Sequence, residues 1–271
     1  MSETPERHEI TRKRVVHQIP GVDAVAIRRD VEYRATDAGP LTMDIYYPPD
    51  AQSGARIPAV VVVAGFSDVG YEAFLGCKFK DTEMCSGWGR LMAASGVAAI
   101  TYTNREPAAD LDALLQHVRQ NAASLGIDEN RIGLWACSAN VPLALSVLMQ
   151  DGTDHLKCAV LFCGYTLDLE GATGVSEAEK KWRFANPAAG KSVDDLPPDL
   201  PLFIARAGRD ENPHLNEALD RFLSRAVACN LPITFTNHRT GPHAFDLFDD
   251  SETSREIIRQ ILAFMRFHLL A

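Results

Sequence analysis

The chain has 271 residues, of which 46% are hydrophobic and 23% are charged, as in a globular protein with one large α/β domain or two small ones. Its formal net charge of -9 argues against nucleic acid or an anionic membrane as the main partner. No apolar run approaches the roughly 18 residues that a membrane-spanning helix needs.

The beginning of the chain and its cysteines indicate a cytoplasmic protein. Residues 1–15 are charged and lack the apolar core of a secretory signal peptide, and we treat residues 1–25 as an N-terminal extension. Without an export signal, the six cysteines are predicted to be free thiols in a reducing cytoplasm. The spacing of Cys77 and Cys85 matches no zinc pattern, so neither a metal nor another cofactor is expected.

The first predicted element is an antiparallel hairpin. Apolar and polar residues alternate over 31–34 and 41–47, on either side of the turn residues 37–40. Residues 59–64 follow as a continuous β-branched run, which predicts a central strand buried on both faces.

Strands and helices then alternate to the end of the chain. Further strands are predicted at 96–102, 131–136, 158–162, 202–205 and 233–235. Helices are predicted around 91–92, from 108 to Gly126, at 143–148, at 215–223, and from a Thr253-x-x-Glu256 capping box onward. This order predicts one domain over 1–271, with a mostly parallel sheet and helices on both faces. The long polar connection 164–200 is predicted to be a lid.

Residues 131–140, RIGLWACSAN, are the most informative stretch for function. A buried strand runs directly into a serine between small residues, as in the nucleophile elbow, whose usual pattern is Gly-x-Ser-x-Gly. Centred on Ser138, the outer positions are Ala136 and Asn140; centred on Cys137, they include the bulky Trp135. The close packing of strand and helix at an elbow therefore favours Ser138 as the nucleophile and Cys137 as a buried neighbour.

An acid and a base follow at the ends of later strands. Ligands bind beyond the carboxyl ends of the strands in such a sheet, and Asp210 and His243 come in turns after two of them. Ser138 would attack a carbonyl, His243 would take its proton, and Asp210 would orient the imidazole. The alternative is that Ser138 has only a structural role, as the N-cap of the helix that follows.

Other residues compete for the acid and base roles. Glu211 is the fallback acid, and His238 is the rival base, although the Gly-Pro turn before His243 is better suited to return a side chain to the sheet edge. His214 is interpreted as a surface residue at the start of a helix.

The ordered set of motifs resembles the α/β-hydrolase superfamily, in particular its dienelactone hydrolase and carboxylesterase-like branches. The resemblance runs from near Val31 to the C-terminus and rests on the approach to the elbow at 126–132, an acid turn at 208–210 and a histidine turn at 243–245. The chain order Ser, acid, His is that of the superfamily. The resemblance implies the α/β-hydrolase fold, and it alone suggests a homodimer.

Two amides are expected to bind the negative oxygen that forms on the substrate. One is the N–H of Ala139, at the start of the helix after the elbow. The other lies in the loop after the 59–64 strand and, by resemblance, is the N–H of Phe66. Ala64 stands where many relatives carry histidine.

The predicted pocket is bounded by the loop 66–88, the lid and the His243 turn, with Ser67, Trp88, Tyr165 and Trp182 as substrate contacts. We predict hydrolysis of a small to medium carboxylic ester or lactone through an acyl-serine intermediate. An amidase or peptidase using the same triad, and a non-catalytic small-molecule-binding homologue, are the alternatives.

Overall fold

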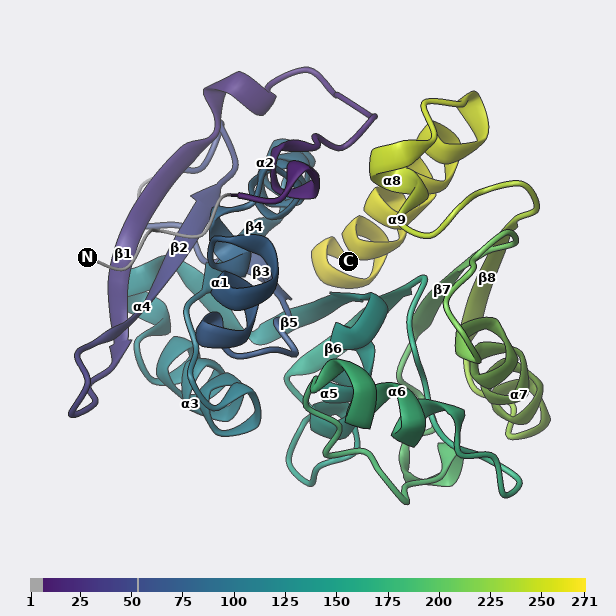
Figure 1. Ribbon diagram of the computed structural model, residues 1–271. Coiled ribbons are helices and arrows are strands. Elements are labelled where there is room, and N and C mark those ends of the chain that lie inside the picture. Colours follow the sequence, from purple (N-terminus) through teal and green to yellow (C-terminus); the bar gives the residue numbers. More distant parts are fainter. Residues whose placement is uncertain (1–6, 53) are drawn as a thin grey trace.

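An eight-stranded sheet organises the molecule. In the computed structural model, which describes residues 7–52 and 54–271, the strands are ordered β1-β2-β4-β3-β5-β6-β7-β8 (Figure 1). They are β1 (Ala26–Arg34), β2 (Leu41–Tyr47), β3 (Ile57–Val62), β4 (Ala98–Tyr102), β5 (Ile127–Cys137), β6 (Leu156–Phe162), β7 (Leu202–Ala207) and β8 (Ile233–His238).

The pairing of the strands confirms the predicted hairpin and the mostly parallel sheet. β1 pairs with β2 and β2 pairs with β4 in antiparallel fashion, and every pair from β4 to β8 is parallel. β3 is buried along nearly its whole length, as its β-branched run predicts for a strand covered on both faces.

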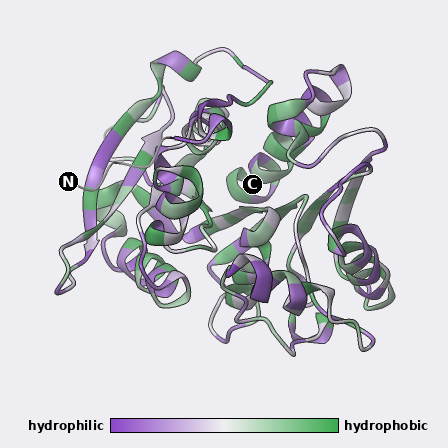
Figure 2. Cartoon of the chain, in the orientation of Figure 1, coloured by the Kyte–Doolittle hydropathy of each residue, from purple (hydrophilic) through white to green (hydrophobic). Residues whose placement is uncertain are grey.

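Helices cover both faces of the sheet (Figure 1). α2 and α9 pack against one face, and α3, α5 and α7 pack against the other. The helices are α1 (Asp68–Leu75), α2 (Glu83–Ala94), α3 (Pro107–Gln120), α4 (Ala122–Leu125), α5 (Val141–Leu148), α6 (Gly174–Trp182), α7 (Leu215–Ala228), α8 (Phe245–Phe248) and α9 (Glu252–Leu270). Hydrophilic and hydrophobic residues alternate along the outer helices (Figure 2), as amphipathic helices require.

The structure corrects two expectations about single elements. The segment 66–88 is not one loop, since it contains α1, a 3₁₀ turn at Phe79–Asp81 and the start of α2. The predicted capping box at Thr253 is also wrong: α9 begins at Glu252, and the Ser251 side chain accepts a hydrogen bond from the Ser254 N–H. Ser251 takes this role because it has extended backbone angles, whereas Thr253 already lies in the first helical turn.

Two segments outside the main alternation lie beside the sheet edge that carries the site. The connection between β6 and β7 contains α6, and its buried side chains Tyr165, Val175 and Phe184 form a small apolar cluster with Leu215 of α7. The part of the N-terminal extension that is described, residues 7–25, includes the 3₁₀ turn η1 (Glu9–Arg12), which packs against α2; residues 1–6 lie outside the described residues.

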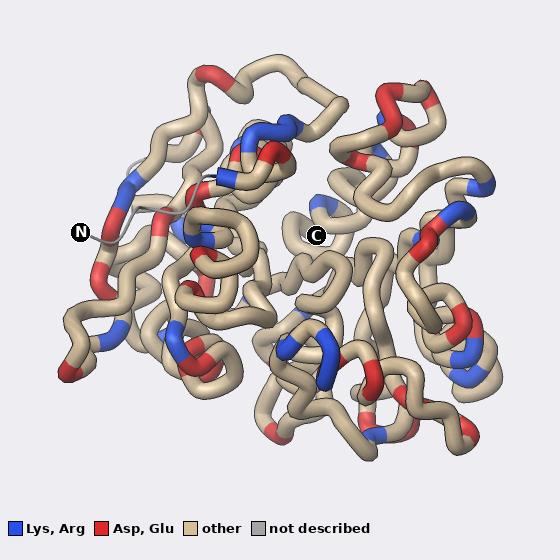
Figure 3. Tube along the Cα trace, viewed as in Figure 1, with Lys and Arg blue, Asp and Glu red and all other residues tan. Residues whose placement is uncertain are grey.

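Charged residues of both signs are interspersed over the outer helices and loops (Figure 3). The six cysteines are free thiols, as predicted, and five of them are buried. Within residues 7–52 and 54–271, no helix is both long and apolar enough to cross a membrane.

Candidate active site

Ser138 lies on a sharp turn between β5 and α5. Its φ of 54° is in the left-handed region, which non-glycine residues occupy rarely and mostly at functional sites. Cys137 before it has ordinary extended angles, and burial raises the pKa of its thiol to about 12. The turn therefore presents the serine hydroxyl, while the neighbouring thiol stays protonated and buried.

The turns after β7 and β8 are held together by their backbones. Gly208 N–H donates to the His238 carbonyl oxygen at 2.8 Å, and Arg209 N–H donates to the Gly241 carbonyl oxygen at 2.9 Å. A Cβ at Gly208 would lie 2.5 Å from the Arg239 oxygen, so only glycine permits this close approach. As a result, Asp210 and His243 face each other across neighbouring strands.

The structure brings Ser138, His243 and Asp210 into one hydrogen-bonded chain. The Ser138 Oγ lies 2.9 Å from His243 Nε2, and His243 Nδ1 lies 2.6 Å from Asp210 Oδ2. Because an ionised carboxylate only accepts hydrogen bonds, Nδ1 carries the proton and Nε2 is left to accept from the serine. The serine, histidine and aspartate side chains are thus arranged as in a Ser-His-Asp triad.

Asp210 is held in its ionised form. Burial alone would raise the pKa of this carboxyl, but the hydrogen bond and charge of His243 and the hydrogen bonds from Asn212 outweigh it and lower the pKa. Both the backbone N–H and the side-chain amide of Asn212 donate to Oδ1, at 3.0 and 2.8 Å. Oδ2 is therefore free to orient the imidazole.

Solved structures with the same arrangement of elements establish the fold. The chain is similar to a hyperthermophilic esterase of the archaeon Pyrobaculum calidifontis, at 19% identity over 97% of this chain and 87% of that one, with a TM-score of 0.67. It is also similar to a thermophilic esterase of the planctomycete Thermogutta terrifontis, at 19% identity over 96% and 98%, with a TM-score of 0.64. The chain has the α/β-hydrolase fold.

Other comparisons complete this result. An α/β hydrolase from a Medee basin deep-sea metagenome library matches at 16% identity, over 91% of this chain and 99% of that one, with a TM-score of 0.63. The Thermogutta terrifontis esterase was also solved with propionate bound, and in that form it matches at 18% identity over 92% and 97%, with a TM-score of 0.62. No protein-family model and no curated protein matches the chain.

Two backbone amides point to an oxyanion site beside the α/β-hydrolase elbow. Among residues 7–52 and 54–271, neither the Phe66 N–H nor the Ala139 N–H has a hydrogen-bond partner. Phe66 follows β3 and Ala139 follows Ser138, so both come from the carboxyl edge of the sheet. That these two amides bind an oxyanion stays a prediction from the sequence.

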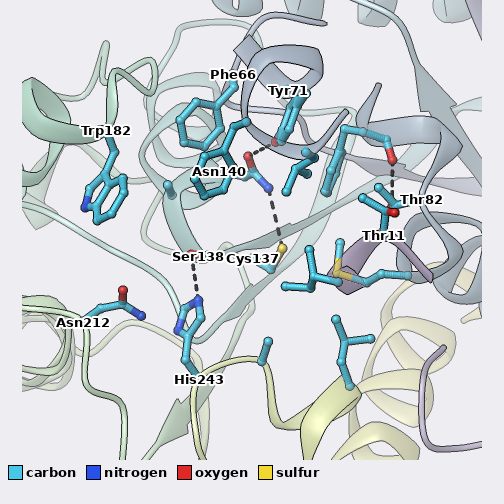
Figure 4. A pocket seen from close by; sticks show the side chains of 18 of the residues that line it. Thr11, Phe66, Tyr71, Thr82, Cys137, Ser138, Asn140, Trp182, Asn212 and His243 are labelled. Atoms are coloured by element: carbon cyan, nitrogen blue, oxygen red, sulfur yellow. Dashed lines mark hydrogen bonds between the residues drawn. The ribbon is translucent and has the colours of Figure 1, made fainter. Parts of the chain in front are cut away.

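Asn140, the residue in the place of the usual elbow glycine, holds the loop after β3. Its Oδ1 accepts a hydrogen bond from the Tyr71 hydroxyl at 2.7 Å, seen in Figure 4, and another from Gly65 N–H at 2.7 Å. A Cβ at Gly65 would lie 2.8 Å from the Ala139 oxygen. The close packing that a glycine at position 140 would usually permit is therefore permitted by the glycine at position 65. Asn140 thereby fixes the backbone that leads to the Phe66 amide.

A second Ser-His-Asp cluster lacks the geometry of a triad. His238 Nε2 lies 3.0 Å from Ser254 Oγ and 2.8 Å from Asp249 Oδ2, so acid and serine share one nitrogen instead of occupying opposite ones. Ser254 is fully buried. His238, the last residue of β8, therefore links this strand to the start of α9 and lacks the geometry expected of the rival base.

The other two competitors are surface residues. Glu211 is exposed. The contact to His243 that was expected of Glu211 as fallback acid is made by Asp210 instead. His214 is exposed and lies 3.1 Å from Glu217 on the first turn of α7, as its interpretation as a helix-start residue predicts.

A cavity of about 310 Å³ opens beside Ser138 and His243, at the small end of the range for ligand pockets. Of the predicted substrate contacts, Tyr165 and Trp182 line it, as does Phe66, one of the predicted oxyanion donors. Ile10 and Thr11 of η1 line it as well. No sequence signal marked them, because the N-terminal extension has no periodic apolar pattern and lies far in the chain from the predicted triad residues.

The predictions that Ser67 and Trp88 contact substrate are wrong. Ser67 is the N-cap of α1 and accepts a hydrogen bond from Gly70 N–H at 3.1 Å. Trp88 is fully buried on α2, where it packs against Trp135 and its Nε1 donates to Asp246 at 2.8 Å. Both were placed in the pocket on the assumption that 66–88 is a loop; as helices, these segments turn the two side chains away.

Charged groups take little part in the cavity. Lys78 and Lys80, near its wall, pair with Asp68 and Asp44 at 3.7 and 3.1 Å, and neither lines it. In the part of the chain that the structure describes, no group of three or more His, Cys, Asp or Glu side chains is placed to hold a metal ion.

Proposed function

We propose that this protein is a serine hydrolase that cleaves a small to medium carboxylic ester or lactone through an acyl-serine intermediate. The observation that carries the proposal is the hydrogen-bonded chain from Ser138 through His243 to Asp210 at the open edge of a cavity. The esterases of the same fold give it further support.

The first half of the proposed reaction acylates the serine. Ser138 Oγ bonds to the ester carbonyl carbon while His243 Nε2 takes its proton, and the carbonyl oxygen gains a negative charge. The N–H groups of Phe66 and Ala139 would bind that oxygen. The C–O bond to the alcohol then breaks, and His243 returns the proton to the leaving oxygen.

The second half releases the acid. A water molecule attacks the acyl carbon while His243 takes one of its protons, and the same two amides bind the oxyanion again. The bond to Ser138 Oγ breaks, and the proton passes from His243 to the serine oxygen. Asp210 keeps the imidazole in the tautomer that both halves need.

Reaction with a fluorophosphonate probe tests the proposal. We expect the probe to label Ser138, located by peptide mapping, and not Cys137, whose thiol is buried and protonated. Ser138→Ala should abolish labelling and lower kcat on p-nitrophenyl esters by about 10⁴-fold or more. Ser254→Ala is the matched control, because it removes the serine of the other Ser-His-Asp cluster and should leave labelling unchanged.

The alternatives give different results. Full ester turnover by the Ser138→Ala protein would overturn the proposal. Absence of both labelling and turnover in the wild-type protein would indicate a binding protein of the same fold. Faster turnover of p-nitroanilides than of the matching esters would identify an amidase.

A further inference from the structure

The cavity extends from Ser138 in two directions that differ in exposure. Figure 4 shows Trp182 and Asn212 on one side of the Ser138–His243 pair and Thr11 and Thr82 on the other. Trp182 is 40% exposed and is in contact with Phe74, which is 67% exposed. Thr11 and Thr82 are 2% and 4% exposed. One arm of the cavity is therefore open and the other is closed; we call the latter the inner arm.

Among residues 7–52 and 54–271, the two threonines of the inner arm leave no hydroxyl group free for a ligand. Thr11 Oγ1 donates to the His8 carbonyl oxygen at 2.7 Å, and Thr82 Oγ1 donates to the Phe79 carbonyl oxygen at 2.9 Å. Both hydroxyls thus bond to their own backbone and leave their methyl groups for contact. Four apolar side chains also line the cavity, Ile10, Phe79, Met84 and Leu247. Ile10 precedes Thr11 in the chain and Phe79 is hydrogen-bonded to Thr82, so we place this group in the inner arm. Such a lining suits a hydrocarbon chain.

The wall formed by Ile10 and Thr11 is fixed to three other elements. His8 N–H donates to the Leu75 oxygen at the end of α1, and Val16 N–H donates to the Asp246 oxygen in α8. Arg14 lies 3.3 Å from Glu83 at the start of α2. A segment bound on both sides of Ile10 is a rigid end to the arm and not a loose flap.

The two-step reaction decides which part of an ester occupies the inner arm. After acylation the alcohol must leave and a water molecule must reach the acyl carbon beside His243. Both are possible through the arm at Trp182, where side chains are exposed. An alcohol in the inner arm would be trapped behind the acyl group and would keep water out.

We propose that the inner arm is the acyl site and that Ile10 of the N-terminal segment sets the longest acyl chain that the enzyme accepts. The inference rests on the proposed serine hydrolase activity and adds the substrate class. The whole cavity, about 310 Å³, is at the small end of the range for ligand pockets and is shared between the two arms. We therefore expect the inner arm to hold a short acyl chain, of about four to six carbons.

Chain-length profiles test this inference. For p-nitrophenyl esters from C2 to C12, kcat/KM of the wild-type protein should peak at short chains and then fall. Ile10→Ala should raise the ratio of kcat/KM for the C8 ester to that for the C4 ester by about tenfold, because the room gained accepts further methylene groups. Ile10→Trp should lower the same ratio and favour the acetate.

Two controls keep the inference falsifiable. Val16→Ala makes a comparable truncation in the same segment away from the cavity and should leave the profile unchanged. A second series with a fixed butyryl group and alkyl alcohols of increasing length should not respond to either Ile10 variant. If this alcohol series shifts and the acyl series does not, or if neither shifts, the assignment of the inner arm is wrong.

A binding measurement separates this inference from the proposed activity. With Ser138→Ala, straight-chain carboxylates should raise the melting temperature most at C4 to C6, and adding Ile10→Ala should move that optimum to longer chains. Ester turnover that depends on Ser138 with an unchanged optimum overturns only the inference. A wild-type protein without turnover, but with the shifted optimum, overturns only the proposed activity.

Discussion

At the scale of single residues, Asn140 shows how one departure from a motif is accommodated. The glycine pattern at an elbow leaves room for the neighbouring strand, and here that room is provided by Gly65 on the neighbour instead. The larger side chain then serves as a hydrogen-bond acceptor for two buried groups, Gly65 N–H and the Tyr71 hydroxyl. Asn140 thus supports the loop that carries the Phe66 amide, which we propose as an oxyanion donor.

Restoring the usual motif should therefore harm the protein. Asn140→Gly leaves two buried donors without an acceptor, each costing about 1–3 kcal/mol, so the free energy of unfolding in urea should fall by about 2–6 kcal/mol. We expect kcat on p-nitrophenyl butyrate to fall about tenfold or more, since the loop that carries the Phe66 amide loses its anchor.

Tyr71→Phe is the matched comparison, because it removes only one of the two hydrogen bonds and should give a smaller loss of stability. The glycine pattern taken by itself leads to the opposite expectation. An Asn140→Gly protein with unchanged stability and higher activity would support that view and refute ours.

At the scale of secondary structure, patterns that involve a whole element were predicted well and short ones were not. The β-branched run of β3 and the helical spacing in α3 reflect the burial of these elements in the core. Because the burial extends along the whole element, the apolar pattern is repeated several times in the sequence. α1 has only eight residues and leaves Phe74 exposed, so its sequence carries little periodic signal. It forms because Ser67 caps it and Gly76 ends it in the left-handed conformation.

The start of α9 gives a direct test of an element boundary. Ser251→Ala removes the side-chain acceptor for the Ser254 N–H and should lower the free energy of unfolding by about 1 kcal/mol. Thr253→Ala should change it by less than about 0.5 kcal/mol, since Thr253 is exposed within the first turn. Urea titrations of both proteins measure the difference, and a larger loss in Thr253→Ala would reinstate the capping box.

At the scale of the whole molecule, Asp246 is a buried carboxyl that links several elements. Its Oδ2 accepts from Trp88 Nε1 on α2, and its backbone oxygen accepts from Val16 N–H in the N-terminal segment. Burial raises the pKa of Asp246 to about 6 from the usual 3.8, against the opposing effect of the Trp88 hydrogen bond. The folded protein therefore binds this proton more tightly than the unfolded chain does.

The sign of the resulting pH dependence follows. The stabilisation from a protonated Asp246 is complete below about pH 4 and is lost as the pH rises through about 6. The free energy of unfolding that is lost in this way is about 3 kcal/mol. Asp246→Asn keeps an acceptor for Trp88 without the buried charge. It should raise the free energy of unfolding at pH 8 by about 1–3 kcal/mol and have little effect at pH 4.

Urea unfolding of the wild-type and Asp246→Asn proteins at pH 4, 6 and 8 measures this effect. Asp23→Asn, at an exposed position, is the control and should follow the wild-type curve. Wild-type and Asp246→Asn curves that run parallel over this range would show that Asp246 is not the group responsible.

The sequence by itself predicted the eight strands in chain order, the fold, and the three residues that the structure joins by hydrogen bonds, Ser138, Asp210 and His243. These predictions were possible because buried strands and helices show a periodic pattern of apolar residues, and because each of the three residues follows a strand. Only the tertiary structure decided the lining of the cavity. Ile10 lines the cavity although it lies near the N-terminus, and the Trp88 side chain is buried elsewhere. Both positions depend on how elements that are distant in the sequence pack together.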